Sequence, residues 1–373
     1  MGFPKPLDSI ERTETVFRLS LVRPLGQRWF RTFAFVVATS FILLVVWTYH
    51  DLMLANFERL HSPEVPVTYD NLASTLKVGE VVSGEEEGVV PGNSLIPQRI
   101  WQIMVNNDNP DPEILRDTKS WLARNIDYQY TLMSTKKSDE FVQKHYADEP
   151  RLLEIYTNLH NTGMKSDLLR YLILNVEGGV YADIDTVALQ PVDAWVPDHL
   201  LGNIRLVVGP EFDQLDGPRW GGMAHFVQFG QWTIAAAAGH PVFRKLIDRT
   251  LQAIEDLLEA YEVPIEDFRP HSHIEVVNST GPIAFTELVF KHMQSFDPTL
   301  KDTKALSAMK EPLVFGDTLV LTIDGFGMGQ QHSGSTNDGT IPKDAFVSHN
   351  FGGTWGKGDQ MDHSGEKGKQ KGK

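Results

Sequence analysis

Cysteine is absent from the 373 residues of the chain. That absence excludes a disulfide-stabilised scaffold, a thiolate zinc site, an iron–sulfur cluster and a cysteine nucleophile. A surplus of positive charge is absent as well, since 34 basic residues stand against 49 acidic ones and the formal net charge is −15. Binding to nucleic acid through phosphate contacts favours the opposite balance, so we expect no nucleic-acid partner. The 41% of hydrophobic residues nevertheless suffices for a large core and excludes wholesale disorder.

Long hydrophobic runs are scarce, and the one that stands out is Thr32–Tyr49, which carries no charge. Its length lies at the short end of the roughly 17–25 residues that a transmembrane helix needs. Six Lys or Arg residues precede it, whereas Arg59 is the only one between residues 50 and 76. The positive-inside rule therefore predicts a signal anchor with a cytosolic N-terminus. A cleaved signal peptide or a core helix fits less well, because no small-residue cleavage site follows the run and no polar stripe interrupts it.

The remaining composition predicts how the chain is divided. Residues 50–95 contain three prolines and a run of three glutamates, which favours an extended stem over a packed unit. The body alternates strand-like and helix-like segments, which predicts an α/β domain with a largely parallel sheet. The expected segments are a cytosolic tail at 1–31, the anchor at 32–49, the lumenal stem at 50–95, the catalytic domain at 96–357 and a disordered Gly/Lys-rich tail at 358–373.

The most informative stretch of the body is Ser166–Thr186, SDLLRYLILNVEGGVYADIDT. Helical spacing in its first half places Asp167 and Arg170 on one face, three residues apart. The pair Gly178-Gly179 is expected to end this helix, because glycine adopts the left-handed conformation that a tight turn requires. We therefore expect a helix, a glycine turn and a strand in direct succession.

The strand expected at Val180–Asp185 carries the acidic motif. Alternation along a strand would point Tyr181, Asp183 and Asp185 to the same side. Two carboxylates this close repel each other unless a cation lies between them. Oxygen ligands of this kind favour Mg²⁺ or Mn²⁺, whose coordination is often completed by phosphate oxygens and water. The pattern is typical of a metal bound to a diphosphate, although an exposed acidic turn would look the same in isolation.

The pattern D-x-x-R-Y…G-G-x-Y-x-D-x-D resembles the Asp-x-Asp sugar-transferase signature of glycosyltransferase family 32 and of the clostridial glucosylating toxins related to it. Further blocks resemble the same family, and together they cover residues 96–357. Within the family, the chain looks most like the fungal initiation-specific α-1,6-mannosyltransferases. The blocks are IPQRIWQ at 96–102, GPEFD at 209–213, QFGQWTIAAAAGHP at 228–241, STGPIAFTE at 279–287 and SHNFGGTW at 348–355.

This resemblance implies a GT-A fold, a Rossmann-like α/β domain that holds a nucleotide sugar and a divalent metal. It implies a retaining, metal-dependent hexosyltransferase that uses Mn²⁺ or Mg²⁺ and transfers mannose from GDP-mannose to protein N-glycans. The acceptor hydroxyl would attack from the face that the phosphate leaves, and the phosphate would take its proton. The implied setting is the Golgi membrane, with a type II topology, a lumenal catalytic domain and a possible complex with other mannosyltransferases.

The resemblance also implies roles for individual residues. The residues expected in catalysis are Asp183, Asp185 and Arg170, and the metal ligands are Asp183, Asp185 and His349. Asp167 and Arg170 match the pair that binds donor hydroxyls and phosphate, although an i,i+3 surface ion pair would have the same spacing. The expected substrate-binding set is Trp101, Asp167, Arg170, Tyr181, Gln228, Gln231 and Trp355.

Trp101, Gln228 and Gln231 each have an alternative interpretation, whereas Trp355 has one expected role. Trp101 would lie near the nucleotide base, but a core tryptophan at a strand end fits the sequence nearly as well. Gln228 and Gln231 would lie near the anomeric carbon, or they would form interior hydrogen bonds around Trp232. Trp355 would cover the diphosphate from the C-terminal side.

Two alternative functions remain open on the sequence. A mannosyltransferase acting on inositol phosphorylceramide belongs to the same family, but it would more readily explain further hydrophobic segments. An inactive scaffold subunit of a mannosyltransferase complex would have no chemical reason to keep the acidic motif together with Arg170 and the tryptophans.

Overall fold

The computed structural model describes residues 94–105, 115–218 and 223–351, all of which belong to one compact unit spanning 73–373. The predicted cytosolic tail, anchor, C-terminal tail and Trp355 lie outside these residues, as does the stem up to residue 93. Within the described ranges, no helix is both long and apolar enough to cross a membrane.

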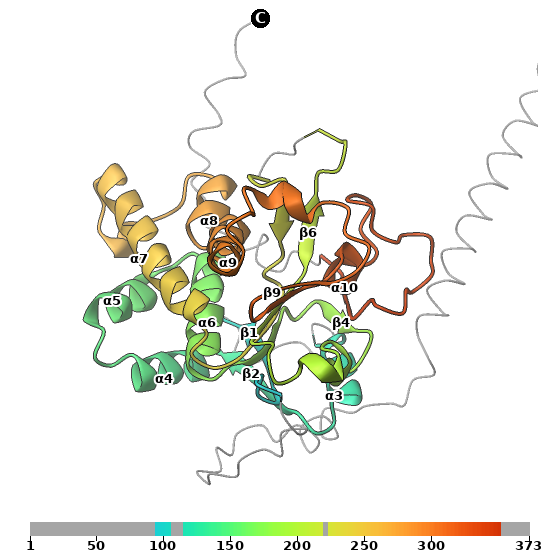
Figure 1. The fold of residues 1–373 in the computed structure, drawn as a ribbon. Helices are drawn as coiled ribbons and strands as arrows, with labels where there is room; N and C mark the ends of the chain where they lie inside the picture. The colour runs from blue at the N-terminus through green and yellow to red at the C-terminus, as the bar shows by residue number, and fades with distance from the viewer. Residues whose placement is uncertain (1–93, 106–114, 219–222, 352–373) are drawn as a thin grey trace, which may run out of the picture. The chain divides into compact units, whose positions relative to one another are not determined.

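A seven-stranded sheet forms the centre of the domain, in the order β2-β1-β3-β8-β5-β10-β9 (Figure 1). Two small two-stranded sheets, β4–β11 and β6–β7, accompany it. The strands are β1 Arg99–Met104, β2 Gln129–Ser134, β3 Gly179–Ala182, β4 Thr186–Ala188, β5 Leu206–Val208, β6 Pro210–Asp213, β7 Val227–Phe229, β8 Thr233–Ala236, β9 Leu313–Phe315, β10 Thr318–Val320 and β11 Val347–His349.

The main sheet is mixed, so the prediction of a largely parallel sheet was wrong. Strands β2, β1 and β3 are mutually parallel, and β10 is parallel to β5. Strand β8 runs antiparallel to both of its neighbours, β3 and β5, and β9 forms an antiparallel hairpin with β10. The apolar run at 313–323 therefore folds back on itself at Gly316, whose φ of +63° suits glycine. The predicted α/β class is confirmed.

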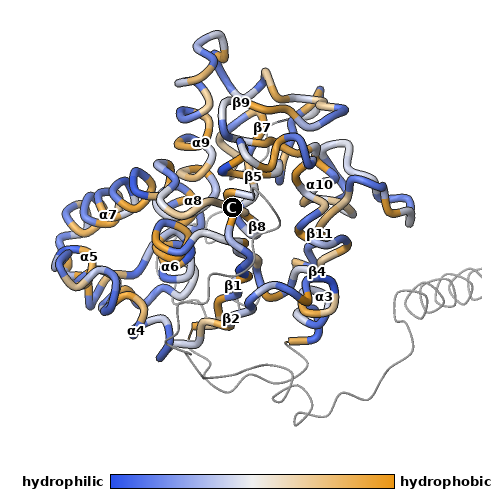
Figure 2. The backbone as a smooth tube through the Cα atoms, turned by 60° about the horizontal axis from the view of Figure 1, so that its bottom comes forward, coloured by the Kyte–Doolittle hydropathy of each residue, from blue (hydrophilic) through white to orange (hydrophobic). Residues whose placement is uncertain are grey.

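Helices cover one face of the sheet and a second layer covers the other (Figures 1 and 2). The larger core lies beneath α4 to α9, and the smaller core lies beneath α3, α10 and β4. Strand alternation divides the side chains between them, since Leu206 and Val208 enter the larger core and Val207 the smaller. The helices are α3 Thr118–Arg124, α4 Thr135–His145, α5 Pro150–Asn158, α6 Thr162–Val176, α7 Pro241–Tyr261, α8 His273–Ser279, α9 Pro282–Phe296 and α10 Ile323–Gly327.

Helix α6 is the element that brings Asp167 and Arg170 into the interior. Every residue from Asp167 to Leu174 is buried, because the helix packs against both α7 and the sheet. The polar side chains of its central turns must therefore find partners inside the protein.

Candidate active site

The turn between α6 and β3 depends on two glycines, as the sequence predicts. Gly178 and Gly179 have φ values of +62° and +93°, which other residues rarely adopt. A Cβ atom on Gly178 would lie 2.5 Å from the backbone nitrogen of Ala238. This close approach lets α6 reverse directly into β3, so Arg170 on the helix and Asp183 after the strand come within reach of each other.

The acidic motif lies in a turn rather than in a strand, which corrects the prediction of a strand over 180–185. Strand β3 ends at Ala182, and the backbone nitrogen of Thr186 donates to the carbonyl oxygen of Asp183 at 3.1 Å. The backbone of Asp183 is fixed from two further sides, since its nitrogen donates to Trp232 O at 2.7 Å and its oxygen accepts from Gln102 Nε2 at 3.0 Å. The turn positions the carboxylates more firmly than strand alternation alone would.

His349 reaches this turn through the pairing of β11 with β4. His349 lies opposite Thr186 in that antiparallel pair, and the backbone nitrogen of Asn350 donates to Asp185 O at 2.9 Å. As a result, His349 Nε2 lies 3.1 Å from Asp185 Oδ1, although the two residues are 164 positions apart in the chain. The C-terminal block is thus tied by its backbone to the acidic motif.

The residues expected to bind metal are brought together. Asp183, Asp185 and His349 each offer one ligand atom, all within 4.8 Å of one another, and all three are half-buried. Two carboxylate oxygens and one imidazole nitrogen form a donor set that suits Mn²⁺ or Mg²⁺. The Nδ1 atom of His349 is buried with no hydrogen-bond partner in the described ranges. Nδ1 is thus free to carry the ring proton, which leaves Nε2 available as a ligand. These residues fit a divalent cation.

Arg170 and Asp167 form a buried pair beside the cluster, not a surface ion pair. Arg170 Nη1 lies 3.1 Å from Asp167 Oδ1, and Arg170 Nη2 lies 3.5 Å from Asp183 Oδ1. The guanidinium also lies over the ring of Tyr181, 4.6 Å from its centroid, and the Tyr181 hydroxyl donates to Asp183 Oδ1 at 2.5 Å. Arg170 therefore connects Asp167 to the metal-binding candidates.

Burial dominates the acidity of these groups. It raises the pKa of Asp167 to about 6, against the opposing effects of Arg170 and of hydrogen bonds from Thr280 and Gln231. Burial likewise raises the pKa of Asp183, which Arg170 and His349 counteract in part and Asp185 reinforces. Three carboxylates, those of Asp167, Asp183 and Asp185, lie around the one guanidinium of Arg170, an arrangement that a bound cation would complete.

The two glutamines lie in different surroundings. Gln231 Nε2 donates to Asp167 Oδ1 at 2.9 Å, so this residue belongs to the polar cluster. Gln228 is fully buried and donates to Glu211 Oε1 at 2.7 Å. In each case the hydrogen bonds are interior, although neither side chain bonds to Trp232.

Trp101 lies in the larger core with 8% of its surface exposed. Its indole nitrogen donates to Gly178 O at 2.8 Å, so the side chain stabilises the glycine turn. A role in contacting the base stays a prediction, and the structure adds a role in holding that turn.

Sequence reasoning missed two residues of the polar cluster. Thr280 Oγ1 donates to Asp167 Oδ2 at 2.8 Å, and the hydroxyl of Tyr171, a single donor, lies within hydrogen-bond distance of Gln231 Oε1 and, at 2.6 Å, of Thr280 O. Tyr171 directly follows Arg170, and Thr280 lies in the block at 279–287. Both residues therefore lie in motifs that the sequence analysis singled out, but only the tertiary structure shows that Tyr171 and Thr280 meet near Asp167.

Known proteins share these features. The profile described as "Glycosyltransferase sugar-binding region containing DXD motif" matches residues 112–201. An initiation-specific alpha-1,6-mannosyltransferase of Schizosaccharomyces pombe is 32% identical over 71% of this chain and 65% of its own length. A Candida albicans protein of the same name is 31% identical over 69% of this chain and 72% of its own length.

More distant similarities extend in two directions. A mannosyl phosphorylinositol ceramide synthase of Saccharomyces cerevisiae is 24% identical over 56% of this chain and 46% of its own length. Among solved structures, the PaToxG glycosyltransferase is 16% identical and covers 55% of this chain and 73% of its own, with a TM-score of 0.39, which is too low to establish a shared fold. The 31% identity to the Candida protein over more than two thirds of its length, together with the DXD profile, shows that the chain belongs to the family of glycosyltransferases with a DXD-containing sugar-binding region.

Proposed function

We propose that this protein is a metal-dependent, retaining glycosyltransferase of the GT-A type that transfers mannose from GDP-mannose, in α-1,6 linkage, to N-linked glycans. The observation that carries the proposal is the assembly of Asp183, Asp185 and His349 beside the buried guanidinium of Arg170. The mannosyltransferase relatives at 31–32% identity support the sugar and the linkage.

Asp183, Asp185 and His349 would hold the divalent ion. When bound, such an ion stabilises the negative charge that develops on a departing diphosphate. Arg170 adds a permanent positive charge to the same region, and its Nε is buried without a hydrogen-bond partner among the residues described. Because that N–H is enclosed by the protein, Arg170 would act on a bound diphosphate mainly through its charge.

Asp167 positions Arg170. Its two carboxylate oxygens accept from Gln231 and Thr280, and Oδ1 also pairs with the guanidinium. Because three groups fix this carboxylate, it can keep Arg170 in one rotamer. The guanidinium then needs little reorganisation when the anionic nucleotide sugar binds. Asp167 is thus a positioning residue in this proposal.

Retention is proposed to occur by attack on the face from which the phosphate leaves. The acceptor oxygen forms its bond to the anomeric carbon as the bond to the phosphate oxygen breaks, and that phosphate oxygen takes the acceptor proton. Glu211, a buried carboxyl group hydrogen-bonded to Gln228, is poorly suited to act as a nucleophile instead. Burial raises its pKa to about 8, so it is largely protonated at neutral pH.

The proposed location is the Golgi membrane, with the single anchor at Thr32–Tyr49 and the catalytic domain in the lumen. The charge asymmetry around that segment supports the orientation. Protease added to sealed Golgi vesicles should remove only the N-terminal tail. Loss of the large domain without detergent would contradict the orientation.

A donor screen tests the function. The purified full-length protein is incubated with GDP-mannose, UDP-glucose or UDP-galactose and an α-mannoside acceptor, with Mn²⁺ or with a chelator, and nucleotide release is measured. We expect turnover with GDP-mannose and Mn²⁺ only, and an α-1,6 product. Preference for an inositol phosphorylceramide acceptor would favour the sphingolipid alternative. No turnover with any donor would favour the scaffold alternative.

A further inference from the structure

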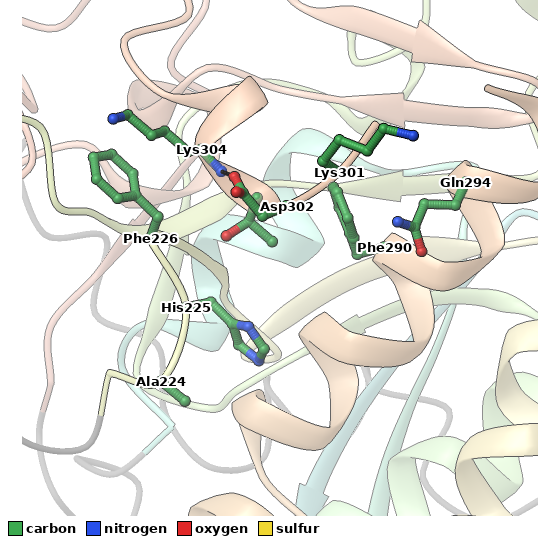
Figure 3. Close-up of a pocket in the computed structure, with 9 residues that line it drawn as sticks. Ala224, His225, Phe226, Phe290, Gln294, Lys301, Asp302 and Lys304 are labelled. Carbon is green, nitrogen blue, oxygen red and sulfur yellow. Dashed lines mark hydrogen bonds between the residues drawn. The ribbon is translucent and has the colours of Figure 1, made fainter. Parts of the chain in front are cut away.

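A cavity of about 410 Å³ lies beside the segment that leads into β7 (Figure 3). Its volume is within the range of roughly 300–1,000 Å³ that is typical of small-molecule sites. Helix α9 and the short 3₁₀ helix η4, Thr303–Leu306, form the other walls. The residues that matter for the chemistry are Phe226, Phe290, Gln294, Lys301, Asp302 and Lys304.

The lining combines apolar rings with hydrogen-bonding groups of both kinds. Figure 3 shows the ammonium groups of Lys301 and Lys304 pointing away from each other, with Asp302 between them. The Lys304 ammonium lies 5.2 Å from the ring centroid of Phe226, and Gln294 Nε2 donates to Leu300 O at 2.9 Å. Asp302 is exposed, and its Oδ1 accepts from the backbone nitrogen of Lys304 at 2.9 Å.

This chemistry matches a sugar ring better than it matches the other common ligands. A purely apolar ligand would displace water from the carboxylate of Asp302 and the amide of Gln294 without replacing its hydrogen bonds. A strongly anionic ligand would meet the carboxylate of Asp302. A pyranose offers an apolar face to the phenylalanine rings and hydroxyls that both donate and accept hydrogen bonds.

Two elements connect the cavity with the candidate active site. Helix α9 begins two residues after Thr280, which binds Asp167, and it carries Phe290 into the cavity wall. With a rise of about 1.5 Å per residue, Phe290 lies roughly 12 Å along the helix from its first residue. Strand β7 makes the second connection: at its start, the nitrogen of Val227 donates to Thr303 of the cavity wall at 3.1 Å, and Gln231, two residues after its end, donates to Asp167.

We propose that this cavity is a subsite for the acceptor glycan, and that it binds sugar residues remote from the hydroxyl that is attacked. The inference rests on the proposed function and specifies its acceptor. An oligosaccharide that reaches from the anomeric carbon of the donor to Phe226 gains contacts that a monosaccharide acceptor cannot make. The subsite therefore makes acceptor affinity depend on glycan length.

The test uses full-length wild-type protein and the variants Phe226→Ala and Gln294→Ala. KM and kcat are measured with α-mannosides of increasing length, and acceptor-independent hydrolysis of GDP-mannose reports on the donor site. Lys291→Ala is the matched control, because Lys291 is exposed on the same helix but does not line the cavity. Cooperative melting at the wild-type temperature confirms that each variant is folded.

We expect the wild-type KM to fall as the acceptor lengthens. In Phe226→Ala, we expect the KM for long acceptors to rise about tenfold, as is common when a buried aromatic contact is lost. Hydrolysis of the donor and the KM for methyl mannoside should not change, and Lys291→Ala should match the wild type. Gln294→Ala should show the same pattern with a smaller rise.

Three results would overturn the subsite. They are a KM independent of acceptor length in the wild type, an equal rise for short and long acceptors in Phe226→Ala, and a marked preference for phosphorylated over neutral glycans that Lys301→Ala and Lys304→Ala abolish. If the wild-type protein hydrolyses and transfers mannose but shows one of these results, the subsite fails and the proposed function stands. If no nucleotide sugar is turned over, the proposed function itself fails.

Discussion

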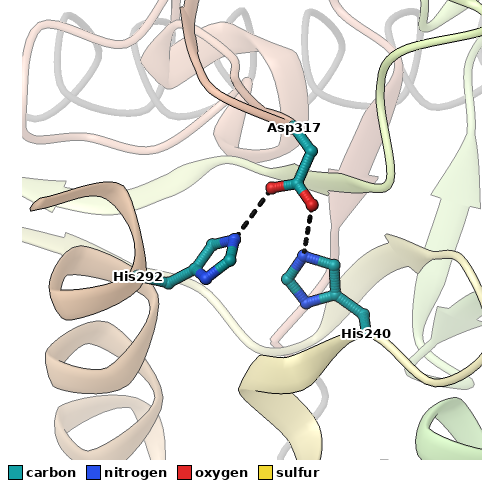
Figure 4. Close-up of side chains that lie close together, drawn as sticks. All are labelled: His240, His292 and Asp317. Atoms are coloured by element: carbon teal, nitrogen blue, oxygen red, sulfur yellow. Dashed lines mark hydrogen bonds and ion pairs between the residues drawn. The ribbon is translucent and has the colours of Figure 1, made fainter. Parts of the chain in front are cut away.

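Two clusters of aspartate and histidine in the described ranges have nearly the same composition but different chemistry. Asp183, Asp185 and His349 form one, and His240, His292 and Asp317 form the other, which Figure 4 shows. In both, the candidate ligand atoms lie within 4.8 Å of one another. The first has two carboxylates and one imidazole, whereas the second has one carboxylate between two imidazoles.

In the second cluster the single carboxylate already has an imidazole on either side, although His240 Nε2 makes no hydrogen bond among the described residues. His292 Nε2 lies 2.8 Å from Asp317 Oδ1, and His240 Nε2 lies 3.4 Å from Asp317 Oδ2. His240 caps α7 by accepting from the nitrogen of Val242 at its Nδ1, which places the ring proton on Nε2, facing Asp317. Because Nδ1 accepts in this cap, His240 could not carry its ring proton there if Nε2 bound a metal. This cluster therefore connects the start of α7 and helix α9 to the turn before β10.

The acidity of the carboxylates separates the two clusters as well. Although burial opposes it, the pKa of Asp317 is lowered, because His292 and His240 stabilise its charge. The pKa of Asp183 is raised, because burial outweighs the help from Arg170 and His349. The surroundings of Asp317 therefore favour its charged form, whereas the burial of Asp183 disfavours its charged form in the absence of a further cation.

The largest effect is expected from Asp185→Asn, which keeps the size of the side chain and removes one charge from the first cluster. Transfer should fall by about 10²–10³, the usual cost of losing one well-placed electrostatic stabiliser. Folding should survive, because the substitution relieves repulsion with Asp183. Steady-state rates and thermal melts measure both effects. Near-wild-type transfer by a folded Asp185→Asn protein would mean that the first cluster does not bind the catalytic metal.

Acidification should weaken the second cluster. Burial lowers the pKa of His240 to about 4 from an ordinary value of 6.5. Below pH 6.5 the unfolded chain binds a proton that the folded chain resists, so this stability is present above pH 6.5 and is lost as the pH falls towards 4. The loss is at most about 3–4 kcal/mol, at 1.4 kcal/mol per pKa unit. Denaturant titrations at pH 7 and 4.5 measure it.

His240→Asn is the matched variant for this measurement, since asparagine can still cap α7 but does not titrate. We expect a shallower dependence of unfolding free energy on pH than in the wild type. An unchanged slope would mean that other groups cause the acid sensitivity.

The smallest effect is expected from His292→Ala, which removes one partner of the half-buried Asp317. The free energy of unfolding should fall by about 1–3 kcal/mol, the usual cost of an unsatisfied polar group. The activity of the folded protein and its response to Mn²⁺ should be retained. His199→Ala, at an exposed position, should change neither. If His292→Ala no longer responded to Mn²⁺, the metal would bind at His240, His292 and Asp317, and our distinction between the two clusters would be wrong.

The sequence predicted the local features of the site and missed those that depend on chain reversals. The glycine turn, the helix that carries Arg170 and the closeness of the Asp183 and Asp185 carboxylates follow from short-range rules about φ, helical spacing and chain geometry. The sheet was misjudged because the antiparallel direction of β8 depends on how the chain returns, which spacing does not encode. Thr280 joins Asp167 across 113 positions, and no local pattern specifies that contact.

Equilibrium binding of Mn²⁺ in the presence of GDP tests the central claim most directly. The wild-type protein, Asp185→Asn and His292→Ala are compared by calorimetry, with the thermal stability of each ligand-bound form as a second readout. The assignment of the metal to Asp183, Asp185 and His349 predicts one Mn²⁺ per chain in the wild type and in His292→Ala, and none in Asp185→Asn. Binding that survives Asp185→Asn but is lost in His292→Ala would contradict it.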